Sequence, residues 1–172
     1  MVQLFSLGIM ITRTIHGFFL AAILSCIVSG CASHRVTISY VDVHYKPPAY
    51  GYQPIIEASI NGVSGNFVID TGAMGPALTK TAVSRCGIAV TPSQGYIVGA
   101  GGGNVRMMQA TNVTVKISQD CAIHWPTVLV FSGDLAQPKG TNDNFFGILD
   151  YGSLRAHSAV LDMKQKTITL TK

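Results

Sequence analysis

The chain has 172 residues, of which 12% are charged, and its formal net charge is +4 at pH 7 with neutral histidines. This length suffices for one modest domain. The basic residues are scattered, without a cluster and without interleaved aromatic residues, which argues against a nucleic-acid-binding surface. We therefore expect no nucleic acid among the partners of this protein.

The N-terminal region has the features of a secretory signal. Arg13 precedes an apolar run over residues 18–30 that is too short for a typical membrane span. The run ends in the sequence VSGC at residues 28–31, which resembles the bacterial lipobox, where an apolar residue and two small residues precede a lipidated Cys. The resemblance implies a lipoprotein signal peptide over residues 1–30, cleavage before Cys31 and lipid on that Cys.

This N-terminus leaves alternatives open. Cys26 is a weaker lipidation candidate, because Leu24 stands where a small residue is preferred, and an ordinary signal with an incidental Cys is a further alternative. Met10 begins a more regular signal than Met1 does, so translation could start at either. With Ala32 after the lipidated Cys, family habit implies a lipid anchor in the bacterial cell envelope, in the outer membrane and facing the periplasm.

We expect residues 31–49 to form a tether and residues 50–172 to form the folded domain. Pro47 and Pro48 interrupt a sheet, because proline cannot donate a backbone hydrogen bond. Residues 36–41 alternate between apolar and polar side chains, a pattern compatible with an added edge strand.

Strand patterns dominate the expected domain. The sequence predicts a hairpin of residues 55–60 and 65–69, because the Asn-Gly dipeptide between them is a strong turn signal. A second hairpin is predicted at the C-terminus from residues 159–161 and 167–170. These signals favour an all-β fold.

One short helix is predicted over residues 80–86, with Thr79 as its N-terminal cap and Gly87 at its C-terminal end. Residues 127–131 form a continuous apolar run that suits a buried strand. Residues 133–144 are polar and contain Pro and Gly, so they predict a loop.

A glycine-rich stretch at residues 99–103 lies between strand patterns at residues 96–98 and 105–110. This arrangement predicts a hairpin with glycines at its tip, where unusual dihedral angles are cheap. A phosphate-binding loop is a poor alternative, because a strand pattern at residues 113–117 comes next instead of a helix.

Asp70 follows the apolar residues 67–69, so it stands at the end of a predicted buried strand. Thr71 and Gly72 come next and favour a turn. A carboxylate in this place is costly unless it is hydrogen-bonded or used in chemistry. Asp70 therefore either caps the turn or acts as a reacting acid.

The order and spacing of four segments carry a family resemblance. They read SINGVSGNFVIDTGA, ALTKTAVSRCGI, VGAGG and FGILDYGSL…AVLDMKQKTITL, and together they span roughly residues 50–171. They resemble the retropepsin-like aspartic proteases, the single-lobe relatives of pepsin. The resemblance implies an all-β fold, a closed barrel-like lobe with a flap hairpin and one short helix.

The same resemblance assigns roles to residues. It implies that Asp70, Thr71 and Gly72 are catalytic and that Ala73 and the flap glycines Gly99, Gly101 and Gly102 bind substrate. Aspartic proteases use two carboxylates that share a proton, whereas this chain has one Asp-Thr-Gly. We therefore expect a homodimer, whose two-fold axis sets Asp70 against its mate, acting on a peptide or protein without a cofactor or a metal ion.

Asp150 is a second acid in an Asp-x-Gly pattern, since Tyr151 and Gly152 come after it. The resembled family usually has Gly at this position, in an Ile-Leu-Gly motif behind the active loop. Tyr in place of Thr or Ser cannot make the compact loop contact. We interpret Asp150 as a solvated turn residue rather than as a second catalytic acid.

Cys86 and Cys121 are the thiols that remain after Cys31. In an oxidising periplasm they would pair as a disulfide, or they are two separate small buried residues. The histidines lack the spacing of a zinc site, and Trp125 is interpreted as a packing residue.

Two functions stay open from the sequence. The first is an aspartic endopeptidase that works as a homodimer. The second is a lipid-anchored binding or structural module that keeps the fold and has little or no turnover. The intact residues 70–73 favour the first, and the departure at Asp150 favours the second.

Overall fold

The computed structural model describes residues 34–44, 51–98, 104–131 and 144–172. One compact unit spans Arg35–Lys172. The expected signal peptide, the lipidation site Cys31 and the glycines of the flap tip lie outside the described residues. Among the described residues, no helix has both the length and the hydrophobicity that crossing a membrane requires.

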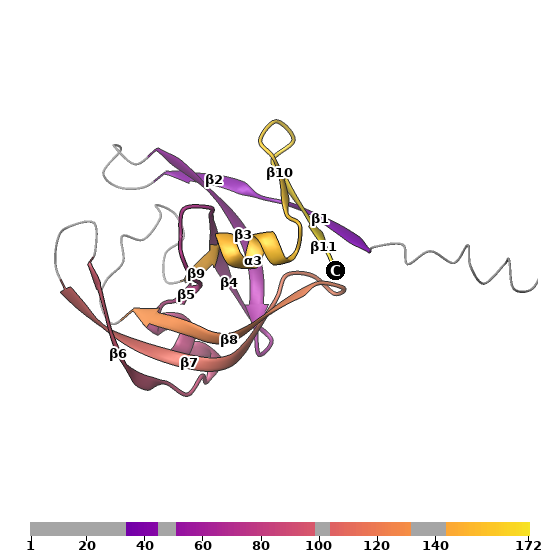
Figure 1. Ribbon diagram of the computed structural model, residues 1–172. Helices are drawn as coiled ribbons and strands as arrows, with labels where there is room; N and C mark the ends of the chain where they lie inside the picture. The colour runs from indigo at the N-terminus through magenta and orange to yellow at the C-terminus, as the bar shows by residue number, and fades with distance from the viewer. Residues whose placement is uncertain (1–33, 45–50, 99–103, 132–143) are drawn as a thin grey trace, which may run out of the picture. The chain divides into compact units, whose positions relative to one another are not determined.

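Most strands belong to one sheet of eight, in the order β2-β3-β4-β9-β5-β8-β7-β6. In chain order they are β2 (Val41–His44), β3 (Tyr52–Ile60), β4 (Val63–Asp70), β5 (Ala77–Leu78), β6 (Thr91–Val98), β7 (Asn104–Lys116), β8 (Ala122–Phe131) and β9 (Phe145–Asp150). A further pairing joins β3 to β7 through Ser59 and Lys116, so the sheet curls round on itself (Figure 1). This is the predicted all-β, barrel-like lobe.

A second sheet has the order β1-β11-β10. Its strands are β1 (Arg35–Ser39), β10 (Val160–Asp162) and β11 (Thr167–Thr171). β1 pairs with β11 along its whole length, and its side chains Val36 and Ile38 pack against the core. The predicted tether is therefore too long: residues 35–39 and 41–44 are strands that pair with β11 and β3, and β1 half-buries Val36 and Ile38, which a tether would leave in water.

The predicted hairpins at residues 55–69 and at the C-terminus are confirmed. β3 and β4 pair around Asn61 and Gly62, whose φ angles of 51° and 80° are positive, as a type I′ turn requires. β10 and β11 pair at the C-terminus. In the turn between them, Asp162 Oδ1 accepts hydrogen bonds from the backbone N–H of Lys164 (2.9 Å) and Gln165 (2.8 Å).

The predicted helix is α2 (Lys80–Cys86). Thr79 Oγ1 accepts a hydrogen bond from the Ala82 N–H at 3.1 Å, and Gly87 closes the helix with a φ of 63°, so both predicted caps are confirmed. A second helix, α3 (Tyr151–Ala156), follows β9 directly. The expectation of a single helix is therefore wrong.

β6 and β7 are the two arms of the predicted flap hairpin, and they pair from Tyr96–Arg106 to Val98–Asn104. β7 then continues as one strand, where the sequence predicted two. Asn112 lies inside this strand with a φ of 55°, a conformation that Asn tolerates better than most residues. The strand therefore passes through a local irregularity without ending.

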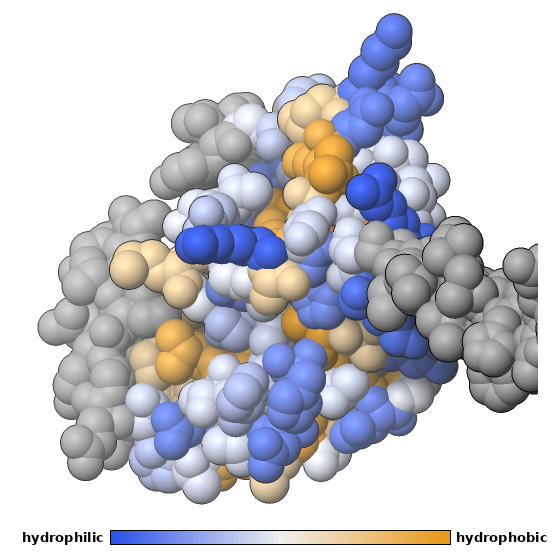
Figure 2. All heavy atoms as spheres, turned by 45° about the vertical axis from the view of Figure 1, so that its right-hand side comes forward, coloured by the Kyte–Doolittle hydropathy of each residue, from blue (hydrophilic) through white to orange (hydrophobic). Residues whose placement is uncertain are grey.

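Aromatic side chains form the centre of the core. Phe67 on β4 has its ring centroid 6.2 Å from that of Phe146 on β9 and 6.4 Å from that of Trp125 on β8. A Cβ on Gly65 would lie 2.1 Å from the Phe146 ring, so this position has room for glycine only. The packing of these aromatic rings therefore holds β4 and β9 side by side. At the surface, on the face shown in Figure 2, hydrophobic side chains appear in small patches among hydrophilic ones.

Candidate active site

Asp70 is the last residue of β4 and is half-buried. The Gly72 N–H donates to Asp70 Oδ1 at 2.9 Å, and the Ala73 N–H donates to the Asp70 carbonyl at 3.2 Å. Within the described part of the chain, Gly72 is the one donor to this carboxylate. Thr71 and Gly72 are exposed, so the loop presents the acid at the surface with acceptor capacity to spare.

Asp150 lies beside Asp70 in the sheet. β4 and β9 are parallel neighbours, and their register pairs these two residues. Asp150 is only 3% exposed, however, and both of its carboxylate oxygens accept hydrogen bonds. The interpretation of Asp150 as a solvated turn residue is therefore wrong.

The carboxylate of Asp150 caps α3. Its Oδ2 accepts from the Gly152 N–H at 2.9 Å, and its Oδ1 accepts from the Ser153 N–H at 3.2 Å and from the Ser153 hydroxyl. The first N–H groups of a helix have no partner within the helix, and Asp is among the residues that satisfy them best. Asp150 is thus held by three donors, where Asp70 has one.

Trp125 connects Asp150 and Ser153 to the core, and we call these three residues the cluster. Its indole Nε1–H donates to Ser153 Oγ at 2.8 Å, and Trp125 is 3% exposed. The packing role expected for Trp125 is confirmed by its contact with Phe67, but its hydrogen bond was missed. Trp125 and Ser153 are 28 residues apart, so no local pattern could have shown this bond.

The loop of residues 71–73, which we call the active loop after its predicted role, is tied to α3 by the backbone. The N–H of Tyr151 donates to the Ala73 carbonyl at 3.3 Å. Ala73, the expected substrate-binding residue of this loop, is half-buried, while the next residue, Met74, is fully exposed. The sequence reasoning did not single out Met74, although an apolar side chain in water directly after the active loop is a candidate contact for substrate.

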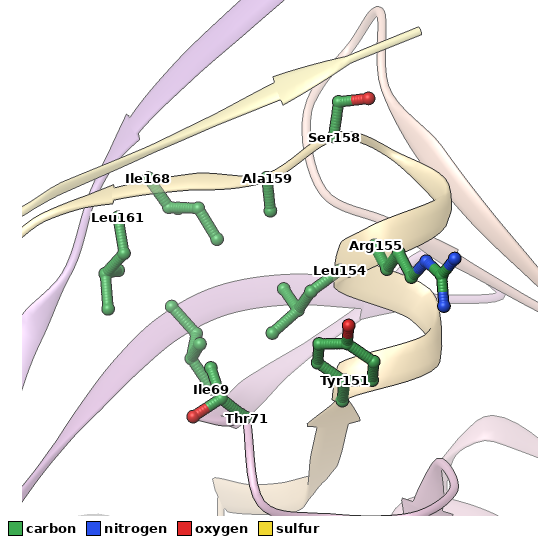
Figure 3. A pocket seen from close by; sticks show the side chains of 9 residues that line it. All are labelled: Ile69, Thr71, Tyr151, Leu154, Arg155, Ser158, Ala159, Leu161 and Ile168. Carbon is green, nitrogen blue, oxygen red and sulfur yellow. The ribbon is translucent and has the colours of Figure 1, made fainter.

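A pocket of about 320 Å³ lies beside the active loop. Ile69 and Thr71 form one wall, and side chains of α3, of residues 158–159 and of strands β10 and β11 form the others (Figure 3). The remaining lining residues are Tyr151, Leu154, Arg155, Ser158, Ala159, Leu161 and Ile168. We call this cavity the α3 pocket, and its walls are mainly aliphatic.

The other expected site residues lie away from Asp70 or outside the described residues. Cys86 and Cys121 are free and buried, so the structure contains the unpaired arrangement rather than the disulfide. Burial raises the pKa of both thiols, while Arg85 beside Cys86 and Lys172 near Cys121 act in the opposite direction. Among the described residues, His, Cys, Asp and Glu side chains form no group of three or more that could hold a metal ion.

A family model described as aspartyl protease matches residues 56–149, more than half of the chain. The chain belongs to the aspartyl protease family. The matched segment includes the hairpin, Asp70 with its loop and all of β9 except Asp150. Asp150, where the chain departs from the resembled pattern, is the first residue after the match.

The chain is similar to solved structures, and the first of them supports the same fold. A retropepsin-like aspartic protease from Rickettsia conorii is 17% identical with a TM-score of 0.50, and the match covers 81% of this chain and 94% of that one. The protease of EIAV, solved with the inhibitor HBY-793, is 24% identical (TM-score 0.49, 67% and 97% covered). The retroviral protease-like domain of Ddi1 from Leishmania major is 20% identical (TM-score 0.48, 67% and 86% covered). No curated protein matches the sequence. The predicted single-lobe, retropepsin-like fold is confirmed.

Proposed function

We propose that this aspartyl protease family member is an endopeptidase that acts as a homodimer, with Asp70 of each copy in one shared site. The observation that carries the proposal is the contrast between its two neighbouring acids. Asp70 lies in an exposed loop with one donor on its carboxylate, whereas both oxygens of Asp150 are occupied by α3. Asp150 is therefore a poor second acid, and the second carboxylate has to come from another copy of the chain.

The chemistry depends on two carboxylates that share one proton. The ionised Asp70 takes a proton from a water molecule, which then attacks the peptide carbonyl. The protonated Asp70 of the other copy donates a hydrogen bond to the carbonyl oxygen as it becomes negative. The C–N bond of the resulting intermediate then breaks as the acid that took the proton from water gives it to the leaving nitrogen. These steps need no group beyond the two acids, the water and the peptide.

The face around Thr71 supports a second copy as the occupant. A two-fold axis that brings two Asp70 carboxylates together must also bring together the residues next to them, of which Thr71 is exposed. The α3 pocket opens beside Thr71 and offers aliphatic walls such as Leu154 and Ile168 (Figure 3). β10 is the edge of its sheet and carries Val160, which is 63% exposed. We propose that the second copy covers this pocket and this edge.

Cleavage of fluorescein-labelled denatured casein at acidic pH tests the proposal. The wild-type chain should cleave the casein, pepstatin should stop it, and specific activity should rise with protein concentration before it saturates. Adding an equal amount of an Asp70→Asn chain should lower the wild-type activity to roughly half, because mixed dimers form with an incomplete site. Constant specific activity at all dilutions would contradict the homodimer. No Asp70-dependent cleavage would instead favour a binding module with little turnover.

We further propose that the chain is attached to the bacterial envelope through lipid on Cys31. The support is the sequence VSGC at residues 28–31. In a bacterial host, Cys31→Ser should abolish labelling by a radioactive fatty acid, while Cys26→Ser should leave it unchanged. Undiminished labelling of Cys31→Ser would contradict the anchor.

A further inference from the structure

Asp150 is a buried acid that the proposed reaction does not use. It lies in register with Asp70 on the neighbouring strand, yet its carboxylate is turned to α3 and is bonded by the Gly152 and Ser153 N–H groups and the Ser153 hydroxyl. A buried carboxylate with such a set of partners is expensive to leave incomplete. Its environment therefore fixes the first turn of α3 against the end of β9.

The direction of the hydrogen bonds is dictated by chemistry. An indole N–H can only donate, so the Ser153 oxygen accepts from Trp125 and its own hydrogen is left for Asp150. Each polar group in this series of hydrogen bonds, from Trp125 through Ser153 to Asp150, then has a bonding partner, which makes the arrangement rigid. Because Trp125 belongs to β8, the cluster anchors α3 to a central strand of the large sheet.

The first turn of α3 in turn holds the active loop. Tyr151 is the first residue of the helix, and its N–H donates to the Ala73 carbonyl at 3.3 Å. The Ala73 N–H donates back to the Asp70 carbonyl at 3.2 Å. We infer that Asp150 is a positioning residue for Asp70: through the turn that it caps, it sets where the loop of Thr71 to Ala73 lies. This inference rests on the proposed function.

The consequence for catalysis is geometric. Two carboxylates that share one proton must keep a defined separation, and a misplacement of about 1 Å can cost about 100-fold in rate. A loop that loses its tie to α3 places Asp70 less well, while every side chain that is expected to bind substrate is still present. We therefore expect kcat to fall and KM to change little.

Three variants of the full chain test this inference with the labelled casein. Asp150→Ala removes the cap and should lower kcat by about 10- to 100-fold, with KM within about twofold of wild type. Asp150→Asn keeps an oxygen acceptor and Asn is nearly as good a cap, so its kcat should return to within a few-fold of wild type. Thr79→Ala removes the N-terminal cap of the other helix, α2, and should leave kcat unchanged.

Hydrogen exchange of the Tyr151 amide, followed by NMR, gives a readout that does not depend on turnover. The amide should exchange faster in Asp150→Ala than in the wild type, and at the wild-type rate in Asp150→Asn. An unchanged rate in Asp150→Ala, or a full wild-type kcat, overturns the inference, as does an equal loss of kcat in Thr79→Ala. The wild type could lack Asp70-dependent cleavage while the Tyr151 amide still exchanges faster in Asp150→Ala. That result overturns the proposed function and still supports Asp150 as the residue that positions the loop.

Discussion

β4 and β9 are parallel neighbours that end on the same residue type, with a glycine two positions later in each case. The two ends differ in everything that decides what a carboxylate can do. Asp70 is half-buried and takes one backbone N–H, from Gly72. Asp150 is 3% exposed and takes three donors from α3.

The difference comes from the element into which each strand leads. After β4 the chain enters a loop of exposed residues, so the carboxylate of Asp70 keeps acceptor capacity for water or for a substrate. After β9 the chain enters a helix, whose first N–H groups have no partner in the helix and bind the carboxylate of Asp150. Whether an Asp at the end of a strand reacts or caps a helix is therefore not set by its residue type. It is set by the number of hydrogen-bond donors that the next element presents to its carboxylate.

The strongest test of this contrast exchanges each acid for its amide. Asp70→Asn should lower turnover of denatured casein by about 1,000-fold or more, because an amide neither takes nor gives the proton. Asp150→Asn should change turnover by no more than a few-fold, because the amide oxygen still caps α3.

Circular dichroism spectra of the two variants provide the control for folding, and both should match the wild type. If Asp150→Asn loses as much activity as Asp70→Asn, the two acids form a dyad within one chain. The homodimer proposal would then be wrong.

For stability, the order of the two acids should be the reverse of their order for turnover: loss of the Asp150 carboxylate should cost more than loss of the Asp70 carboxylate. Asp150→Ala leaves two helix N–H groups and a buried hydroxyl without their acceptor, so the free energy of unfolding should fall by about 2–3 kcal/mol. Asp70→Ala removes a carboxylate with one donor at the surface, and the expected change is about 0.5 kcal/mol or less.

Urea denaturation at one fixed protein concentration measures both changes, since a dimer makes stability depend on concentration. Equal losses for Asp70→Ala and Asp150→Ala would show that the loop after β4 is as structural as the cap after β9.

Much of the surroundings of Asp70 was predictable, because the signals are local. The Asn-Gly turn at residues 61–62 fixes the hairpin that ends in Asp70. Thr79 and Gly87 mark the two ends of α2 through hydrogen bonds and dihedral angles within a few residues. Each of these features depends on residues that are close together in the sequence, so each could be predicted from it.

The surroundings of Asp150 were harder to predict, because they depend on distant contacts. α3 has six residues, too few for a hydrophobic period to be visible. Its cap was a usable local signal, since Asp150 precedes a segment without Pro and is among the residues preferred at a helix N-terminus. The bond that joins this cap to the core comes from Trp125 through Ser153, and the pairing of β1 with β11 joins residues from opposite ends of the domain. Neither contact can be predicted from a short segment of the sequence.

A smaller effect is expected from Ser153→Ala, which removes the hydroxyl between Trp125 and Asp150. The buried indole N–H then lacks its acceptor, so the free energy of unfolding should fall by about 1–2 kcal/mol. Trp125 is the one Trp in the chain, so intrinsic fluorescence reports on this bond directly. The emission spectrum should shift in Ser153→Ala. It should remain as in the wild type in Asp70→Asn, which leaves the cluster intact.

The smallest effect on the single chain should come from Thr71→Ala, although Thr71 and Ser153 are both hydroxyl residues within three positions of their Asp. Thr71 is exposed where Ser153 is buried, so its loss should change the free energy of unfolding by about 0.5 kcal/mol or less. Under the homodimer proposal, the Thr71 side chains of two copies meet beside the paired acids. Thr71→Ala should then raise the protein concentration needed for half-maximal casein cleavage by several-fold, since an interface hydrogen bond contributes about 1 kcal/mol. Thr71→Ser keeps the hydroxyl and should need nearly the wild-type concentration. If Thr71→Ala shows wild-type concentration dependence but lower turnover at saturation, Thr71 acts on the substrate or on Asp70 and not on the contact between copies.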